Sequence, residues 1–312
     1  MRLPAGVELE RYASGIRNPS NLAFDSRGRL WATSAGVQTA PSDGVWMVPR
    51  RGARPRQVVR GLFSALGLTW HRGELYVSHV VPYATFAPSH TGRVVAYSGF
   101  DGRRFRRQRV VIEGLPTGRH RVDSIVAGPG ERLYLGVGSQ ADNLRSSQSL
   151  SATVVSFRRG GGGLRVEARG LRNPYGLAVA PLARLAAHSA PGAIAVARRF
   201  GRWGPSAFVT RFGSTFDANP TGGDVVRVSL ARLGRRRTAP VERFATGFGR
   251  QEPLGAALGP DGSLYVSLWT SGRIVRLVPR AAAPAAAGRP PQGPATLLRA
   301  LASLCRALGL CD

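Results

Sequence analysis

The sequence predicts an all-β fold: a six-bladed β-propeller of four-stranded antiparallel blades, five complete and one truncated, followed by a C-terminal helix. Three observations support this prediction. Two apolar strands joined by a Gly/Asp/Pro turn recur along the chain. A second strand pair follows each copy, and four strands per repeat is the make-up of a propeller blade. The chain of 312 residues also contains 40 glycines and 22 prolines, as expected for turn-rich β structure.

The repeat sets the predicted blades. Its glycines, as in the Gly-Pro-Asp-Gly turn of the last copy, stand where a tight turn needs a positive φ. The five copies span residues 21–34, 66–78, 124–137, a looser 193–210, and 254–267. The leading strands of the second pairs begin at residues 44, 92, 152, 223 and 272. We expect residues 7–12 to form the outer strand of the last blade, which closes the ring and covers an edge.

One interval in the repeat is anomalous. The second strands of neighbouring copies begin at Leu133 and Ala207, and this separation of 74 residues is the longest in the chain. It contains a half-repeat, residues 174–179, with no partner of its own kind. The sequence therefore predicts a truncated sixth blade here.

The composition changes at the end of the predicted propeller, residues 1–280. An Ala/Pro/Gly-rich linker is predicted at 281–294, and leucines at helical spacing predict an amphipathic helix at 295–312. Both cysteines, Cys305 and Cys311, lie in this last segment, where only a chain reversal would let them bond. The role of these cysteines stays open.

No apolar run is long enough to predict a transmembrane segment, and the N-terminus lacks the apolar core of a signal peptide. Either the protein stays inside the cell or a leader is missing from this sequence. The compartment is therefore left open.

The formal net charge is +27, and every basic side chain other than histidine is an arginine. Codon usage in a GC-rich genome explains the absence of lysine. A polyanionic partner would explain the charge as well. The arginine runs at 103–109 and 235–237 fall in predicted hairpin tips, where a solvated surface is the usual explanation. An anionic partner stays open, and nucleic acid is not favoured.

His120 is the candidate catalytic residue. It stands just before a predicted inner strand, and inner strands line the central channel of a propeller. A neutral imidazole at the channel mouth can act as a general base. The alternative is a loop histidine in a hydrogen-bond network. The five histidines share no metal-binding spacing and acidic clusters are absent, so no side-chain metal site is predicted.

Four segments, taken in order, resemble the glucose/sorbosone dehydrogenase family, whose members depend on pyrroloquinoline quinone (PQQ). The first runs from Gly118 to Asn143 around His120, and the second contains Gly-Leu-Arg-Asn-Pro at 170–174. The third covers 188–228, and the fourth covers 246–277 with its Gly-Arg-Ile-Val-Arg-Leu ending. The resemblance extends over roughly residues 15–280. It departs from the family after Pro181, where a long acidic stretch is missing.

The resemblance implies a six-bladed propeller that oxidises a small-molecule sugar or sugar aldehyde by hydride transfer to PQQ. It implies His120 as the general base, with Arg172 and Asn173 beside the quinone. It also implies Arg211 as a basic contact of the cofactor, and Arg250 is expected to hold a carboxylate near the mouth. The missing stretch would carry the family's calcium loops, so PQQ is implied and calcium is left unassigned. An extracytoplasmic location is implied in the same way.

Two functions remain open on the sequence. The first, which is favoured, is a PQQ-dependent oxidoreductase with His120 as its base. The second is a degenerate, non-enzymatic propeller that binds an anionic ligand or partner through its arginine-rich faces. The missing loops and the net charge support the second function.

Overall fold

The fold was analysed in a computed structural model of the chain. The structure describes residues 1–36, 43–81, 91–128, 131–141, 148–177, 191–213, 222–233, 241–249 and 252–280. Residues 1–280 form one compact unit. The predicted linker (281–294) and C-terminal helix (295–312), with Cys305 and Cys311, lie outside the described residues.

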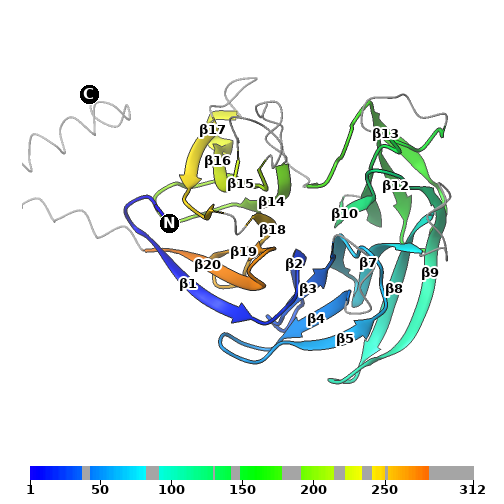
Figure 1. Ribbon diagram of the computed structural model, residues 1–312, viewed down its shortest axis with the longest axis horizontal. Helices are drawn as coiled ribbons and strands as arrows, with labels where there is room; N and C mark the ends of the chain where they lie inside the picture. The colour runs from blue at the N-terminus through cyan, green and yellow to red at the C-terminus, as the bar shows by residue number, and fades with distance from the viewer. Residues whose placement is uncertain are drawn as a thin grey trace, which may run out of the picture. The chain divides into compact units, whose positions relative to one another are not determined.

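The described residues form five four-stranded antiparallel sheets, which we number as blades in chain order (Figure 1). Blade 1 contains β2 (Pro19–Phe24), β3 (Leu30–Ser34), β4 (Gly44–Val48) and β5 (Arg56–Arg60). Blade 2 contains β6 (Gly67–His71), β7 (Glu74–Val81), β8 (Thr91–Phe100) and β9 (Phe105–Pro116). Blade 3 contains β10 (Val122–Ala127), β11 (Arg132–Val137), β12 (Thr153–Arg158) and β13 (Arg165–Arg169). Blade 4 contains β14 (Pro191–Ala197), β15 (Ser206–Arg211), β16 (Asp224–Ser229) and β17 (Val241–Ala245), with the short α1 (Leu230–Leu233) after β16. Blade 5 contains β18 (Pro253–Leu258), β19 (Leu264–Leu268), β20 (Arg273–Pro279) and β1 (Val7–Ser14).

The N-terminal strand closes the last blade, as predicted. Strand β1 pairs antiparallel with β20, from Val7 opposite Pro279 to Ser14 opposite Arg273. This pairing joins the first and last strands of the propeller, so the outer edge of β20 is covered by the chain's own beginning.

The prediction of a sixth, truncated blade is wrong for the described residues. The described part of the half-repeat, residues 174–177, forms no strand. Its backbone is bonded elsewhere: the Ser124 N–H donates to the Tyr175 carbonyl at 3.3 Å, and the Tyr175 N–H donates to the Asn173 carbonyl at 2.8 Å. A strand without sheet partners leaves its backbone groups unpaired. The half-repeat lies against β10 instead of starting a blade.

The hydrophobic core lies between neighbouring blades. Separate clusters of buried side chains join blades 1 and 2, blades 2 and 3, blades 4 and 5, and blades 5 and 1. Within the described ranges, no such cluster joins blades 3 and 4. Residues 172–177 pass along this junction, where a Cβ added to Gly176 would come within 2.0 Å of the Gly192 carbonyl oxygen of β14. At this junction the backbone of Gly176 therefore lies directly against that of Gly192.

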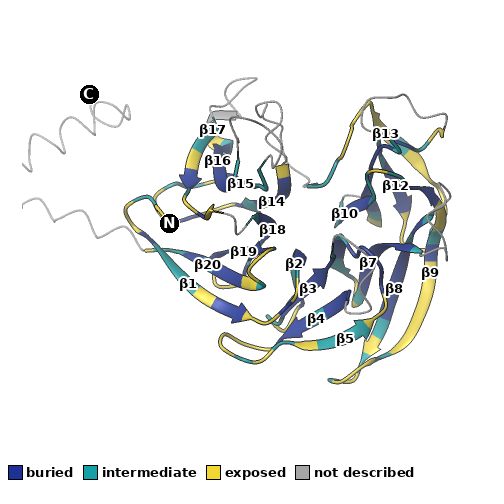
Figure 2. Cartoon of the chain, in the orientation of Figure 1, coloured by how far each residue is buried: buried dark blue, intermediate teal, exposed yellow. Residues whose placement is uncertain are grey.

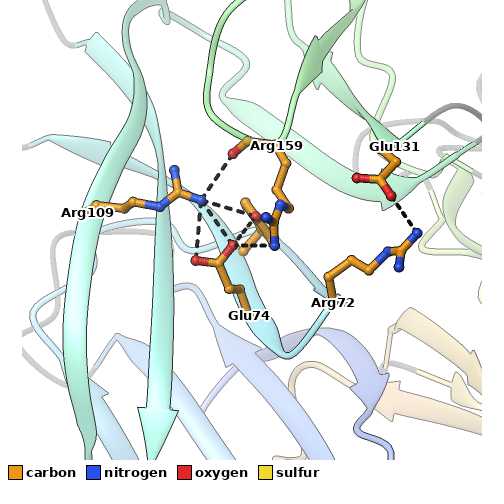
Figure 3. Close-up of polar contacts among 6 residues, drawn as sticks. Arg72, Glu74, Arg109, Glu131 and Arg159 are labelled. Carbon is orange, nitrogen blue, oxygen red and sulfur yellow. Dashed lines mark hydrogen bonds and ion pairs between the residues drawn. The ribbon is translucent and has the colours of Figure 1, made fainter.

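Ion pairs between blades 2 and 3 supplement the apolar packing (Figure 3). The Arg109 guanidinium of β9 donates to the Glu74 carboxylate at 3.1 Å and to the Arg159 carbonyl at 3.1 Å. Arg159 also approaches Glu74 at 3.6 Å, and Arg72 pairs with Glu131 at 2.5 Å. These contacts connect the blade 2 sheet to the turn after β12 and the turn before β11.

Candidate functional site

The five inner strands surround one central channel. Its volume is about 270 Å³, and its walls come from β2, β6, β10, β14 and β18 together with Leu177. Figure 2 shows these inner strands mostly buried, whereas the outer strands β9 and β13 carry long exposed stretches. In every blade the first strand is the innermost, so the loops that precede these strands share one end of the channel. We call this end the channel mouth.

The loop before β10 places His120 at the mouth. Its backbone is fixed on both sides, because the His120 N–H donates to the Ser139 carbonyl at 3.1 Å and the Gly118 N–H donates to the His120 carbonyl at 3.0 Å. A Cβ added to Gly138 would come within 2.5 Å of the His120 Cβ, so only glycine fits opposite the histidine. Backbone hydrogen bonds therefore hold the loop that carries this ring.

Arg172 lies next to this ring. The Ser139 N–H donates to the Arg172 carbonyl at 2.8 Å, which holds the Gly-Leu-Arg-Asn-Pro segment against the end of β11. The Arg172 Nε then lies 3.4 Å from the His120 Nε2, which accepts its hydrogen bond. Two residues that the sequence assigned to one site, 52 positions apart, are thus brought together. Asn173 follows directly and is exposed.

The two Gly-x-Arg-Asn-Pro copies differ in structure. In the first copy, Asn18 has a positive φ of 47° and donates to the Trp269 carbonyl at 3.4 Å, whereas Asn173 has no positive φ. Arg17 acts on the buried Asp43: burial raises the pKa of that carboxyl, while N–H groups and the Arg17 charge oppose the rise. The first copy therefore serves packing, and the shared motif is no argument that Arg172 does so.

Arg211 is bound by a carboxylate. Its Nε and Nη2 donate to the two oxygens of Asp224 at 2.7 and 2.6 Å, and the Asp224 side chain has no exposed surface. Arg243 adds a third contact to Asp224 at 3.0 Å. Arg211 ends β15 in blade 4, and it would have to leave Asp224 to contact a ligand. Arg250 lies outside the described residues.

Asp123 of β10 and Tyr175 form a buried polar pair. They follow His120 and Arg172, respectively, by three residues along the chain. Asp123 is 1% exposed, and neither its Oδ2 nor the Tyr175 hydroxyl has a hydrogen-bond partner among the residues that the structure describes. Burial raises the pKa of Asp123 well above its ordinary value. Burial also raises the pKa of Tyr175, and the Asp123 charge adds to that rise. Sequence reasoning missed this pair; a carboxylate inside the apolar run of an inner strand was the available signal.

Another histidine is fixed in blade 2. The His79 Nδ1–H donates to the Val80 carbonyl at 2.9 Å, and its Nε2 accepts from the Arg93 Nε at 2.9 Å. Burial lowers the pKa of His79 to about 4. This imidazole is neutral at physiological pH and both of its nitrogens are occupied, so it is a structural histidine.

Within the described ranges, no three His, Cys, Asp or Glu side chains lie together as metal ligands. Over the same residues, no helix has the length and apolar character needed to cross a membrane.

Comparison of the sequence with protein-family models finds no match, and comparison with curated proteins finds none either. Solved structures do match. A putative oxidoreductase (glucose dehydrogenase) from Thermus thermophilus is 21% identical with a TM-score of 0.66, and the match covers 88% of this chain and 100% of that chain. The holo PQQ domain of pyranose dehydrogenase from Coprinopsis cinerea is 15% identical with a TM-score of 0.65, covering 89% and 96%. The soluble aldose sugar dehydrogenase of Escherichia coli is 15% identical with a TM-score of 0.64, covering 88% and 100%.

These matches extend over nearly the whole of each compared chain. They agree with the resemblance found in the sequence. The chain has the β-propeller fold of the glucose and aldose sugar dehydrogenases.

Proposed function

We propose that the protein is a PQQ-dependent dehydrogenase of a sugar or sugar aldehyde, with His120 as the general base. The observation that carries this proposal is the contact between His120 and Arg172 at the channel mouth. The solved sugar dehydrogenases with this fold support the proposal independently.

The residues at the mouth fit a planar polyanion. PQQ is a tricarboxylate, and the exposed Arg172 guanidinium and Asn173 amide offer the donors that carboxylate and quinone oxygens accept. These two residues would hold the quinone next to His120.

His120 can do the proton chemistry from its observed position. Its Nε2 accepts a hydrogen bond from Arg172, so this nitrogen carries a lone pair and can take the proton of a substrate hydroxyl. Arg172 must release the ring as substrate arrives, and its charge then lies beside the oxygen that develops negative charge. When bound, PQQ supplies the acceptor for the hydride that leaves the same substrate carbon.

The test measures PQQ-dependent dye reduction with a panel of aldoses. His120→Ala is expected to lower turnover by at least about 100-fold, the usual contribution of a positioned base, while PQQ binding and the melting temperature stay unchanged. His71→Ala is the matched control, because His71 is the last residue of the inner strand β6 and lies at the end of that strand opposite the mouth. Turnover by His120→Ala equal to wild type would refute the role of His120. Absence of PQQ binding by the wild type would refute the proposed function.

A further inference from the structure

Arginines that are not fully exposed have acceptors throughout the described part of the chain, with one exception. The paired ones donate to carboxylates, to hydroxyl and carbonyl oxygens, or to an imidazole nitrogen: Arg29, Arg93, Arg132, Arg211, Arg227 and Arg276. This is the usual rule, because a guanidinium taken out of water needs partners for its five N–H groups. The exception is Arg121.

Arg121 is half-buried against an aromatic ring. Its guanidinium carbon lies 5.5 Å from the centre of the Phe63 ring, and no hydrogen bond or ion pair of this side chain is found among the described residues. Burial lowers the pKa of Arg121, with no carboxylate to offset it. The Phe63 ring covers one face of the guanidinium and leaves its N–H edge without an acceptor.

The position of Arg121 indicates which kind of ligand its N–H groups can bind. Arg121 follows His120 directly, and its carbonyl accepts the Gly138 N–H at 2.9 Å, so the same rigid loop holds both side chains. Arg172 places its own guanidinium beside the His120 ring. The mouth therefore presents two guanidinium groups, and the proposed function uses only that of Arg172 for the quinone.

We propose that Arg121 binds a carboxylate of the substrate, so that the preferred substrates are acidic sugars of the uronic acid class. A carboxylate matches the planar guanidinium fork with two parallel hydrogen bonds, whereas the hydroxyls of a neutral sugar offer no charge. An aromatic ring beneath the guanidinium holds it flat and excludes water from one side. That this carboxylate belongs to a substrate rests on the proposed function. That Arg121 binds a carboxylate does not depend on it.

The test is calorimetric titration of the full chain without PQQ, using D-glucuronate and D-glucose as probes. The wild type is expected to bind glucuronate more tightly than glucose. Arg121→Gln is expected to weaken glucuronate binding by about 10- to 100-fold, the usual effect of losing a charge-assisted pair, and to leave glucose binding unchanged. Arg121→Lys keeps the charge without the fork and is expected to fall between the two.

Arg202→Gln is the matched control. Arg202 is also stacked on an aromatic ring, 4.8 Å from the centre of the Trp203 ring, but it lies in the turn between β14 and β15 at the other end of the channel. This variant is expected to bind glucuronate like the wild type. Equal melting temperatures of all variants exclude misfolding as the cause of weaker binding.

Two outcomes would overturn the inference. Wild-type protein that binds glucuronate no better than glucose would show that the mouth does not select a carboxylate. Arg121→Gln that loses PQQ binding and keeps glucuronate binding would show that Arg121 holds the quinone instead. If glucuronate binds through Arg121 and no sugar is oxidised, the proposed function fails and the carboxylate site stands.

Discussion

Replacing Asp224 with asparagine should destabilise blade 4 strongly. Asp224 opens β16 opposite Arg211 of β15, has no exposed surface, and accepts three hydrogen bonds from two guanidinium groups. Asparagine keeps the shape but removes the charge and turns an NH₂ group toward an arginine donor. The Arg211 side chain, only 13% exposed, would then be a charge without a counterion.

The magnitude follows from this burial. Removing one partner of a buried ion pair costs about 3–5 kcal/mol, and the residual exposure of Arg211 places the expected loss near the lower end, about 3 kcal/mol. Arg243 contributes less, because its side chain is 67% exposed and an exposed pair is worth at most about 1 kcal/mol.

Urea denaturation followed by tryptophan fluorescence measures the free energy of unfolding. Asp224→Asn should lower it by about 3 kcal/mol, and Arg243→Gln, the matched control, by less than about 1 kcal/mol. If Asp224→Asn stays within about 0.5 kcal/mol of wild type, the pair is not buried in solution as described. Comparable losses in the two variants would show that burial does not decide the energy.

Two further predictions concern buried titratable groups. The pKa of Asp123 is raised, so the folded state binds its proton more tightly than the unfolded state, and stability falls as pH rises above about 4. Asp123→Asn should therefore raise the free energy of unfolding at pH 8 and change it little at pH 4; a lower stability at pH 8 would contradict this. The pKa of His79 is lowered to about 4, so the unfolded state protonates first as pH falls below about 6.5. The His79 contribution should cost roughly 3 kcal/mol between pH 6.5 and 4, so over this range His79→Gln should lose about that much less stability than wild type in urea denaturation.

Much of the fold could be predicted from the chain because it is local. Alternating apolar residues and Gly-containing turns define strand pairs within a few residues of each other, and all five predicted repeats form blades. The outer strand at 7–12 was also predictable, since a propeller must close its last sheet. The blade count was not predictable in the same way. Whether the half-repeat at 174–179 finds strand partners depends on chain that lies elsewhere, and its described residues bond to β10.

The candidate site, like the fold, could be predicted from the sequence only in part. The sequence by itself predicted His120 at the channel mouth, and the family resemblance implied Arg172 beside the quinone. Only the tertiary structure brought them within 3.4 Å, and only it showed that Arg211 is bound by Asp224 while Arg121 has no acceptor in the described part of the chain. Hydrogen-bond partners in a propeller come from neighbouring strands and blades, often tens of residues away. The sequence therefore determined which residues reach the channel mouth, and the packing of the blades decided which of their charges are left for a ligand.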